Sequence, residues 1–335
     1  MRIDAQLSPE DPDIAGQAHA AEQAGQHTLW IGESNGDCFL QALCAADATT
    51  TLGVGTAVAI AFARTPMTVA YSSYGLAAMS RGRFVLGLGT QVKAHIERRF
   101  GMPWSHPAPR MAEFVRALRA IWSAWQDGTR LDFRGEFYTH TLMAPFFAPP
   151  PHEWGPPPVY LAGVGERMTE VAGEVADGWI WHAFTTQRFL REVSLPALER
   201  GRAKRADAPG ELARTGFAFV TTGRDAAELD AAVRGTKKQI AFYASTPAYR
   251  AVLDLHGLGA LQPELSQLAR QGRWDDMIEV IPDDLLHAVS VVGSPDEAGR
   301  ALKGRWSGVA TSITLSTPYE VAPDALARVV ATAAE

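Results

Sequence analysis

Glu33 and Ser34 lie in a pentapeptide that could carry nucleophilic chemistry. Gly32-Glu33-Ser34-Asn35-Gly36 matches the Gly-x-Ser-x-Gly pattern of a serine-hydrolase nucleophile and lies between a predicted strand and a predicted helix. An α/β-hydrolase also needs earlier strands and an oxyanion loop, and only about thirty residues precede this pattern. The histidine of a triad would have to be His256 or His287. We therefore interpret the segment as a loop at a strand end, in which Glu33 is a candidate for proton transfer and helix capping or ion pairing is the alternative.

Two glycine pairs follow predicted strands, at Gly87-Leu88-Gly89 and at Gly163-Val164-Gly165. The second pair opens a helix, where free backbone N–H groups and the helix dipole can hold a phosphate. A dinucleotide fingerprint needs a third glycine, but Val92 and Met168 stand at those positions. The sequence therefore predicts no dinucleotide fold, and a tight strand-to-helix turn is the alternative for each pair.

His182 ends a predicted strand and has Trp179 and Trp181 beside it. This position directs the side chain into the mouth of a barrel, where it could transfer a proton or orient a substrate. A packed or rim histidine is the alternative. The nine histidines form neither His-x-His nor His-Glu-x-x-His, so we expect no metal site.

Apolar groups are abundant near the predicted strand ends, and acids, bases and nucleophiles are few. This composition suits a cofactor that brings its own reactivity. For a flat redox ring, the protein needs mainly to provide a complementary shape, hydrogen bonds and exclusion of water.

These residues must be positioned by alternating strands and helices. Residues 81–101 show one unit, with a short apolar strand, a polar turn at Thr90 and Gln91, and an amphipathic helix. Eight strands are predicted, at 2–7, 27–31, 52–61, 83–88, 159–162, 178–182, 216–221 and 309–315. Helices are predicted between and after them, at 11–25, 36–50, 65–79, 111–125, 168–175, 187–205, 225–235, 295–303 and 326–333. This alternation favours a (β/α)8 TIM barrel over a two-domain doubly wound protein.

Two segments interrupt the alternation. The segment at about 126–158 contains Asp-Gly, Arg-Gly and two proline clusters, which predicts an irregular insertion. The segment at about 237–282 predicts short helices over the top of the fold, as a lid or substrate wall to which Tyr243, Tyr249, Arg250 and Trp274 could contribute. We therefore expect one barrel domain over residues 1–335 with these two insertions.

Composition and charge limit the classes of partner. The 335 residues are 47% hydrophobic and 20% charged, as in ordinary globular proteins. A net charge of −6 with dispersed basic residues argues against nucleic-acid and anionic-membrane binding. The longest apolar run falls short of a bilayer span of ~20 residues, and residues 1–13 lack a secretory pattern, so we expect a cytoplasmic location. Cys38 and Cys44 match neither a redox pair nor a zinc set.

Several stretches together resemble the luciferase-like monooxygenase superfamily. They are residues 81–101, the helix that follows through Trp122, and VYLAGVGERMTEVAGEVADGWI at 159–180. Within the superfamily the chain resembles the deazaflavin-dependent oxidoreductases that use coenzyme F420, to which YASTPAYRAVLDLHG, RQGRWDDM and VVGSPDEAGRAL are also similar. The resemblance covers nearly the whole chain. It implies a barrel that holds the isoalloxazine-like ring at the carboxyl ends of its strands.

The resemblance also implies cofactor-binding positions. A non-proline cis peptide in the third strand, which bulges against the ring in many members, would fall between Ala57 and Val58. The ring-contacting turn after the fourth strand matches Thr90 and Gln91, where relatives often have Thr-Gly, so the Gln91 amide could bond the ring or narrow the pocket. The phosphate-side turn after the fifth strand matches Ala162, Gly163, Val164 and Gly165.

Sugar-phosphate dehydrogenases of this superfamily carry a histidine after the second strand and a glutamate after the fourth. Ser34 and Val92 occupy those positions here, so we exclude that substrate class.

We therefore expect an oxidoreductase that passes a hydride between C5 of coenzyme F420 and an unidentified small organic substrate. Glu33, Ser34 and His182 are the candidates for proton transfer or substrate orientation. One alternative is an FMN-dependent luciferase-like monooxygenase that activates oxygen, and another is a deazaflavin-binding or carrier protein without turnover. The expected partners are a small-molecule substrate and a second copy of the chain, as a homodimer.

Overall fold

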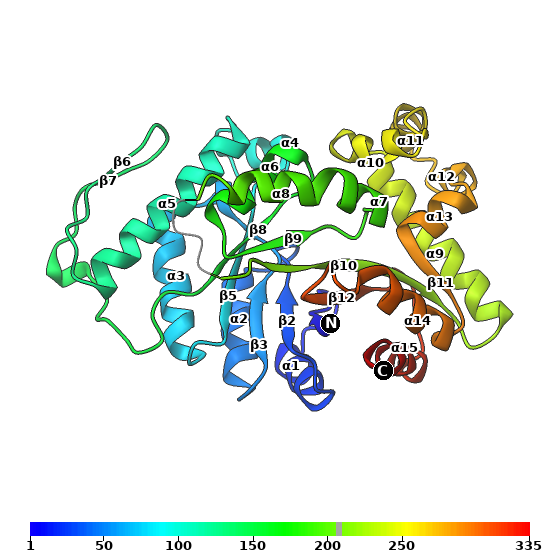
Figure 1. The fold of residues 1–335 in the computed structure, drawn as a ribbon, viewed down its shortest axis with the longest axis horizontal. Helices are drawn as coiled ribbons and strands as arrows, with labels where there is room; N and C mark the ends of the chain where they lie inside the picture. Colours follow the sequence, from blue (N-terminus) through cyan, green and yellow to red (C-terminus); the bar gives the residue numbers. More distant parts are fainter. Residues whose placement is uncertain (206–209) are drawn as a thin grey trace.

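In the computed structural model, which describes residues 1–205 and 210–335, eight parallel strands close into a barrel surrounded by helices (Figure 1). The ring closes because β9 pairs with β10 in parallel register, from Gly178 opposite Ala213 to Trp181 opposite Gly216. The barrel strands are β1 (Arg2–Gln6), β2 (Thr28–Ile31), β3 (Gly53–Thr56), β5 (Phe84–Gly89), β8 (Val159–Ala162), β9 (Gly178–Trp181), β10 (Ala213–Thr222) and β12 (Ser312–Ser316). The predicted (β/α)8 barrel is confirmed, and each of the eight predicted strands has its counterpart in the ring.

The third predicted strand is the one that differs most from its prediction. The segment 52–61 is not continuous, because β3 ends at Thr56 and β4 (Ala59–Ile60) begins only after a cis peptide bond between Ala57 and Val58. β4 then pairs with β5, and a 3-10 turn at Ala61–Ala63 follows. The interruption places residues 57 and 58 at the barrel mouth.

Helices cover the outside of the barrel. They are α1 (Ile14–Gln23), α2 (Cys38–Asp47), α3 (Pro66–Met79), α4 (Lys93–Arg98), α5 (Pro107–Gln126), α6 (Glu166–Val175), α7 (Gln187–Phe189), α8 (Leu195–Arg202), α14 (Pro295–Trp306) and α15 (Pro323–Ala334). The predicted start of α3 is confirmed, since Thr65 caps it and Pro66 takes its first position.

Two predicted helices need correction. The helix within residues 81–101 is only the six-residue α4, because Gly101 adopts a left-handed φ of 65° and the long amphipathic helix, α5, begins separately at Pro107. The helix predicted at 187–205 is interrupted by a π-helical segment at Leu190–Ser194 between α7 and α8.

The insertion at about 126–158 is an extended arm. It holds a two-stranded ribbon of β6 (Phe133–Arg134) and β7 (Thr139–His140) and a 3-10 turn at Pro145–Phe147. The arm projects from the barrel beside α5 in Figure 1.

The second insertion is built on a strand that the sequence did not predict. β11 (Ser290–Gly293) pairs with the C-terminal end of β10, from Phe219 to Thr222. The helices on this pair are α9 (Ala226–Ala244), α10 (Arg250–Leu255), α11 (Leu261–Arg270), α12 (Asp276–Val280) and α13 (Asp283–Val289). α9 runs past its predicted end at Gly235, because this glycine faces Tyr319 so closely that a Cβ would lie 2.8 Å from the Tyr319 Cβ.

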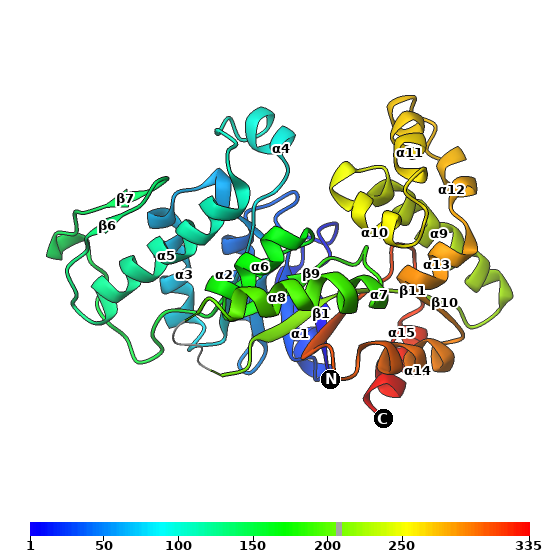
Figure 2. The ribbon, with the colours of Figure 1, turned by 45° about the horizontal axis from the view of Figure 1, so that its top comes forward.

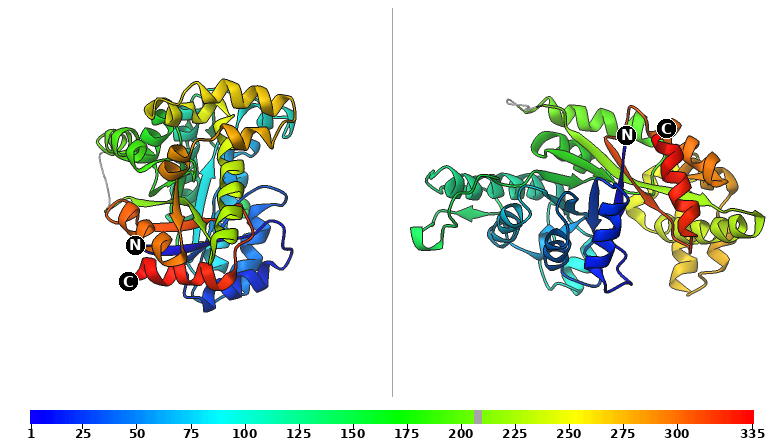
Figure 3. Two further views of the ribbon diagram at one scale, coloured as in Figure 1. Left: turned by 90° about the vertical axis from the view of Figure 1, so that its right-hand side faces the viewer. Right: turned by 90° about the horizontal axis from the view of Figure 1, so that it is seen from below.

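The second insertion has a hydrophobic core of its own, separate from that of the barrel. Its buried side chains include Phe184, Phe219, Ile240, Leu253 and Leu285. Figure 2 shows that α10 and α11 stand on the same side of the barrel as α4. The termini lie side by side on another part of the molecule (Figure 3). The insertion is therefore positioned to wall the mouth of the barrel.

Asp4 of β1 carries a buried carboxylate. Its Oδ2 accepts hydrogen bonds from Trp30 Nε1 at 2.9 Å and Ser312 Oγ at 2.5 Å, and burial raises the pKa of Asp4. No helix within the described ranges is long and apolar enough to cross a membrane, and the cytoplasmic location stays a prediction.

Candidate active site at the barrel mouth

A cavity of about 400 Å³ opens at the carboxyl ends of β1, β2, β3 and β5. This volume lies within the range of sites for cofactors and drug-sized ligands. The residues that line it, called the mouth cavity below, are Gln6, Leu7, Pro9, Gly32, Glu33, Ser34, Gln41, Ala57, Val58, Ile60, Gln91 and Tyr243. Five of the predicted site residues therefore meet here, together with the predicted wall residue Tyr243.

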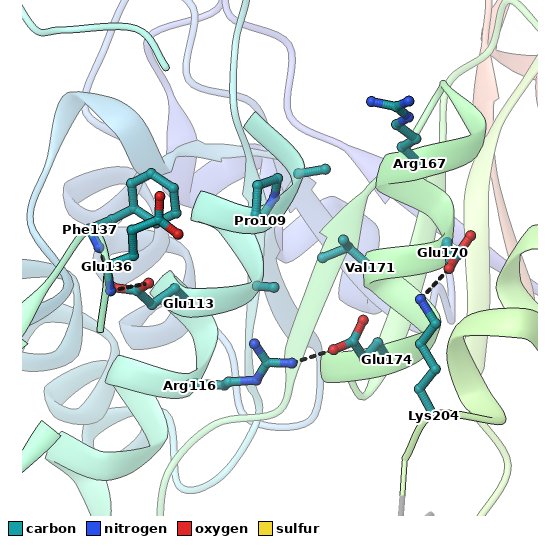
Figure 4. A pocket seen from close by; sticks show the side chains of 12 residues that line it. Pro109, Glu113, Arg116, Glu136, Phe137, Arg167, Glu170, Val171, Glu174 and Lys204 are labelled. Atoms are coloured by element: carbon teal, nitrogen blue, oxygen red, sulfur yellow. Dashed lines mark hydrogen bonds and ion pairs between the residues drawn. The ribbon is translucent and has the colours of Figure 1, made fainter. Parts of the chain in front are cut away.

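A larger hollow of about 520 Å³ lies outside the barrel, between α5 and α6 (Figure 4). Four of the charged side chains that line it are paired with one another, since Arg116 bonds Glu174 and Lys204 bonds Glu170. Glu113 accepts hydrogen bonds from the backbone N–H groups of residues 136–138. These pairings join elements of the fold to one another.

The peptide bond between Ala57 and Val58 is cis, as the sequence resemblance predicted. Two glycines of β5 give this segment its room, because a Cβ on Gly87 would lie 1.8 Å from the Thr56 carbonyl oxygen and one on Gly89 2.5 Å from Val58 Cγ2. Thr56 Oγ1 donates to the Gly87 carbonyl at 2.7 Å and accepts from the Gly87 N–H at 2.9 Å. The glycines at the end of β5 are therefore needed because residues 56–58 pack directly against them.

Glu33 follows β2 and is held in an ion pair with Arg64. Arg64 Nη2 lies 2.6 Å from Glu33 Oε1, and Arg64 Nη1 lies 2.7 Å from Oε2. Oε2 also accepts the backbone N–H of Ile60 at 2.7 Å. Both carboxylate oxygens therefore have donors, so the geometry favours the ion-pair alternative over proton transfer. Arg64 was missed because only its position before the cap of α3 and its charge opposite to that of Glu33 mark it in the sequence.

Gln91 lines the mouth cavity with a left-handed backbone, at a φ of 59°. Glycine adopts this conformation most easily, which agrees with the Thr-Gly that the family resemblance led us to expect here. The Gln91 Oε1 accepts the N–H of Val92 at 2.9 Å, and Thr90 Oγ1 donates to the Gln91 carbonyl at 2.9 Å. The side-chain oxygen is therefore occupied locally, and only the Nε2 amide is left for a ligand.

The turn after β8 leaves its backbone donors free. Gly165 caps α6 without a side-chain hydrogen bond, and the N–H groups of Val164 to Arg167 have no partner among residues 1–205 and 210–335. Free N–H groups at a helix N-terminus bind anions. A Cβ on Gly165 would meet nothing within 4 Å, whereas one on Gly163 would lie 3.0 Å from the N and Oγ1 atoms of Thr169. Gly163 is thus needed for packing and Gly165 faces open space.

His182 follows β9 and packs among tyrosines. Its ring centroid lies 4.4 Å from that of Tyr243, edge to face, and 4.9 Å from that of Tyr249. The His182 Nδ1 accepts the backbone N–H of Phe184 at 3.1 Å. Burial lowers the pKa of His182 to about 4, so the ring is neutral at pH 7. Trp179 and Trp181 are buried and pack with each other, and Trp181 stacks on Trp306.

Ser34 lines the mouth cavity, whereas His256 and Arg250 do not belong to its lining. Ser34 is exposed, and its Oγ donates to Asn35 Oδ1 at 3.4 Å. His256 Nε2 bonds Thr186 Oγ1 at 2.9 Å instead of joining a serine triad. Arg250 is paired with Asp254 at the surface. The geometry therefore gives no support to the hydrolase alternative.

The site thus has two sides. We call residues 32–34, 56–60, 64 and 87–91 the front wall, and residues 162–167, 182–184, 243 and 249 the rear wall. Polar groups of the front wall bond one another, while several donors of the rear wall are free. A polar group without a partner at a concave site is the group that a ligand can pair with.

Comparison with known proteins gives a consistent result. The family model described as luciferase-like monooxygenase matches residues 2–311. An uncharacterised protein of Mycobacterium tuberculosis is 50% identical over 309 residues, which cover 92% of this chain and 91% of that protein. The 5,10-methylenetetrahydromethanopterin reductase of Methanolobus tindarius is 28% identical over 307 residues, which cover 89% of this chain and 88% of the reductase.

Solved structures share the fold. The coenzyme F420-dependent tetrahydromethanopterin reductase from Methanopyrus kandleri superposes with a TM-score of 0.79 at 20% identity, covering 98% of this chain and 96% of that one. An F420-dependent secondary alcohol dehydrogenase in complex with an F420-acetone adduct gives a TM-score of 0.73 at 18% identity, with the same coverage of 98% and 96%.

Proposed function

Since the chain belongs to the luciferase-like monooxygenase family, we propose that it is an oxidoreductase that uses coenzyme F420 to reduce or oxidise a small organic substrate. The observation that carries the proposal is a mouth cavity at the ends of β2, β3 and β5 together with an uncapped helix N-terminus after the neighbouring strand β8. Similarity to a putative coenzyme F420-dependent oxidoreductase of Mycobacterium tuberculosis, and to an F420-dependent reductase and dehydrogenase of the same fold, supports the choice of cofactor.

The residues present fit the two ends of such a cofactor. The mouth cavity has the volume for a flat ring, with Ala57 and Val58 on one side and the Gln91 amide at its edge. The free N–H groups of residues 164–167 fit the phosphate, and Arg167 adds a positive charge with no ion-pair partner in the described part of the chain. Figure 4 shows the Arg167 side chain directed away from Glu170 and Glu174.

The bound deazaflavin would supply hydride chemistry at its C5 atom, and the protein would supply position. Glu33 and Arg64 hold the backbone at Ile60, so they fix the segment that carries the cis peptide. We therefore assign Glu33 a positioning role. Ser34 is exposed at the rim of the cavity, where its hydroxyl can exchange a proton with solvent. His182 packs against Tyr243, which lines the cavity.

Two other functions fit the same family. An FMN-dependent monooxygenase would use the same cavity for an isoalloxazine ring, and a carrier would bind the deazaflavin without turnover. We propose the F420 oxidoreductase over these two because relatives and solved structures of this fold include F420-dependent enzymes.

Equilibrium titrations test the proposal. The purified protein is titrated with coenzyme F420 and, separately, with FMN, following the fluorescence of each. We expect micromolar or tighter binding of F420, about −8 kcal/mol, and much weaker binding of FMN. Binding of FMN alone would support the monooxygenase, and binding of neither would refute a redox function. Oxidation of bound reduced F420 by any compound of a carbonyl and imine panel separates the enzyme from the carrier.

We also propose that the protein is a homodimer. The arm carries exposed apolar side chains at Leu142, Phe146 and Phe147, which are 82%, 90% and 64% exposed. A cluster of this kind commonly marks a protein contact. Light scattering during size-exclusion chromatography should give twice the chain mass of 36.2 kDa, and a mass of one chain would contradict the proposal.

A further inference from the structure

We propose that His182 donates a hydrogen bond from Nε2 to the oxygen of the substrate, and that the substrate is therefore an uncharged carbonyl compound or its alcohol. This inference rests on the proposed function, because it assigns the substrate of the same redox site. It concerns residues that form the rear wall and does not depend on the exact pose of the cofactor.

The tautomer of His182 follows from one hydrogen bond. The Phe184 backbone N–H points at the His182 Nδ1 at 3.1 Å, and a backbone N–H can only donate. Nδ1 must therefore be the unprotonated nitrogen. In a neutral imidazole the proton is then on Nε2, which makes Nε2 a donor.

This donor is free. No hydrogen bond to Nε2 exists within residues 1–205 and 210–335, and Nε2 does not belong to the fully enclosed polar atoms without partners. The ring lines a small hollow with Gly163 and Val164 and contacts Tyr243, which lines the mouth cavity. His182 thus stands between the phosphate-side turn and the substrate wall, with one N–H left for a ligand.

The surroundings of His182 exclude charged ligands. Of the residues that line the mouth cavity and the hollow beside it, Glu33 alone carries a charge, and it is paired with Arg64. The pKa of His182 is lowered by burial, and no neighbouring charged group contributes to the shift. A carboxylate, phosphate or cationic imine would therefore lose its hydration without gaining a counter-ion, which disfavours its binding.

The aromatic rings around His182 also favour an uncharged, hydrophobic substrate. Phe184 lies edge to face with Tyr249, with ring centroids 5.6 Å apart, and Tyr243 and Tyr249 lie 5.7 Å apart. Burial raises the pKa values of both tyrosines, so the phenols stay protonated and uncharged. Neutral rings of this kind suit a hydrophobic substituent next to the reacting carbon.

A neutral donor suits hydride transfer to a carbonyl group. The substrate carbon gains the hydride with its two electrons, the π pair of the C=O bond moves to oxygen, and the oxygen takes a proton from solvent. Solvent regains one proton when the reduced cofactor becomes oxidised, so charge and atoms balance. The hydrogen bond from Nε2 strengthens as negative charge grows on the oxygen, and a donor of this kind typically contributes about 100-fold in rate.

Three substitutions separate the donor from the shape of the ring. His182→Phe keeps an aromatic ring without a donor, His182→Gln places an amide N–H near the position of Nε2, and His182→Asn places it near Nδ1. We expect kcat with a neutral ketone to fall about 100-fold in the Phe and Asn variants and to be largely restored in the Gln variant, with F420 affinity and thermal midpoint little changed. Equal kcat in all variants would overturn the inference.

Nitrogen-15 NMR of histidine-labelled protein bound to F420 gives an independent readout. The resonances of His182, assigned with the Gln variant, should report a proton on Nε2 and no titration between pH 5 and 8. A proton on Nδ1, or titration near pH 6.5, would overturn the inference. Failure to bind F420 would refute the proposed function instead. Binding of F420 with turnover of anionic or cationic substrates alone would refute only the substrate class.

Discussion

The two walls of the barrel mouth differ in how their polar groups are used. In the front wall Glu33, Arg64, Thr56 and Gly87 bond one another and the backbone. In the rear wall the N–H groups of residues 164–167 and the His182 Nε2 have no partner within the described ranges. Groups that are satisfied internally hold a shape, and groups that are left free bind ligands. Substitutions in the front wall should therefore affect stability most, and substitutions in the rear wall should affect binding most.

The largest effect is expected from Gly87→Ala in the front wall. The added Cβ would lie 1.8 Å from the Thr56 carbonyl oxygen, which is a backbone atom and has no side-chain freedom to move away. We expect a loss of at least about 3 kcal/mol of unfolding free energy, measured by urea denaturation. Gly75→Ala in α3 is the matched control, since its Cβ meets nothing within 4 Å, and should stabilise by about 0.5–1 kcal/mol. An unchanged unfolding free energy in Gly87→Ala would contradict the distinction between the walls.

Arg64→Met tests the ion pair of the front wall. The side chain of Glu33 is 7% exposed and that of Arg64 is 18% exposed, so the substitution leaves a buried carboxylate with fewer donors. We expect a loss of about 2 to 3 kcal/mol, below the full value for a buried pair because Arg64 keeps some contact with water. Arg188→Met breaks the exposed pair with Glu192 and should change stability by about 0.5 kcal/mol or less. Equal effects in the two variants would contradict the positioning role of Glu33.

The rear wall should make stability depend on pH through His182. The pKa of this group is about 4 in the folded protein and about 6.5 when unfolded, so the unfolded chain takes up the proton first as pH falls. Its contribution is complete above pH 6.5 and is lost as pH falls toward 4. Between pH 7 and pH 5 the wild type should lose roughly 2 kcal/mol more than His182→Gln. Parallel stability curves for the two proteins would show that His182 is not desolvated.

The architecture of the molecule could be predicted from its sequence, because it follows from local patterns. The strand and helix alternation fixes the barrel, and Thr65-Pro66 fixes the start of α3. The strand β11 escaped prediction because its four residues, Ser290–Gly293, give too short an apolar run to be distinguished from the end of α13. The predicted end of α9 at Gly235 was wrong because this glycine packs against Tyr319 within the helix and does not end it.

The site could be predicted in part. The cis bond at Ala57–Val58 came from the family resemblance, and the positions of Gln91 and Tyr243 in the wall came from strand ends and the second insertion. The ion pair of Glu33 with Arg64 could not be read from spacing, since the two residues lie on different elements and any of several basic residues could have been the partner. The tautomer of His182 depends on a single backbone N–H two residues later, which has no signature in the sequence.

The affinity of the Gly165→Asp variant for coenzyme F420 tests the central claim most directly. A carboxylate at this helix cap should accept the free N–H groups of α6 and stabilise the protein by a few tenths of a kcal/mol, while it repels a phosphate at the same place. We predict F420 binding at least about tenfold weaker than in the wild type, a loss of 1.4 kcal/mol or more, together with an unchanged or higher thermal midpoint. Gly165→Asn, a neutral cap of the same shape, should weaken binding less. Unchanged affinity in Gly165→Asp would contradict the claim that the free donors of the rear wall hold the cofactor.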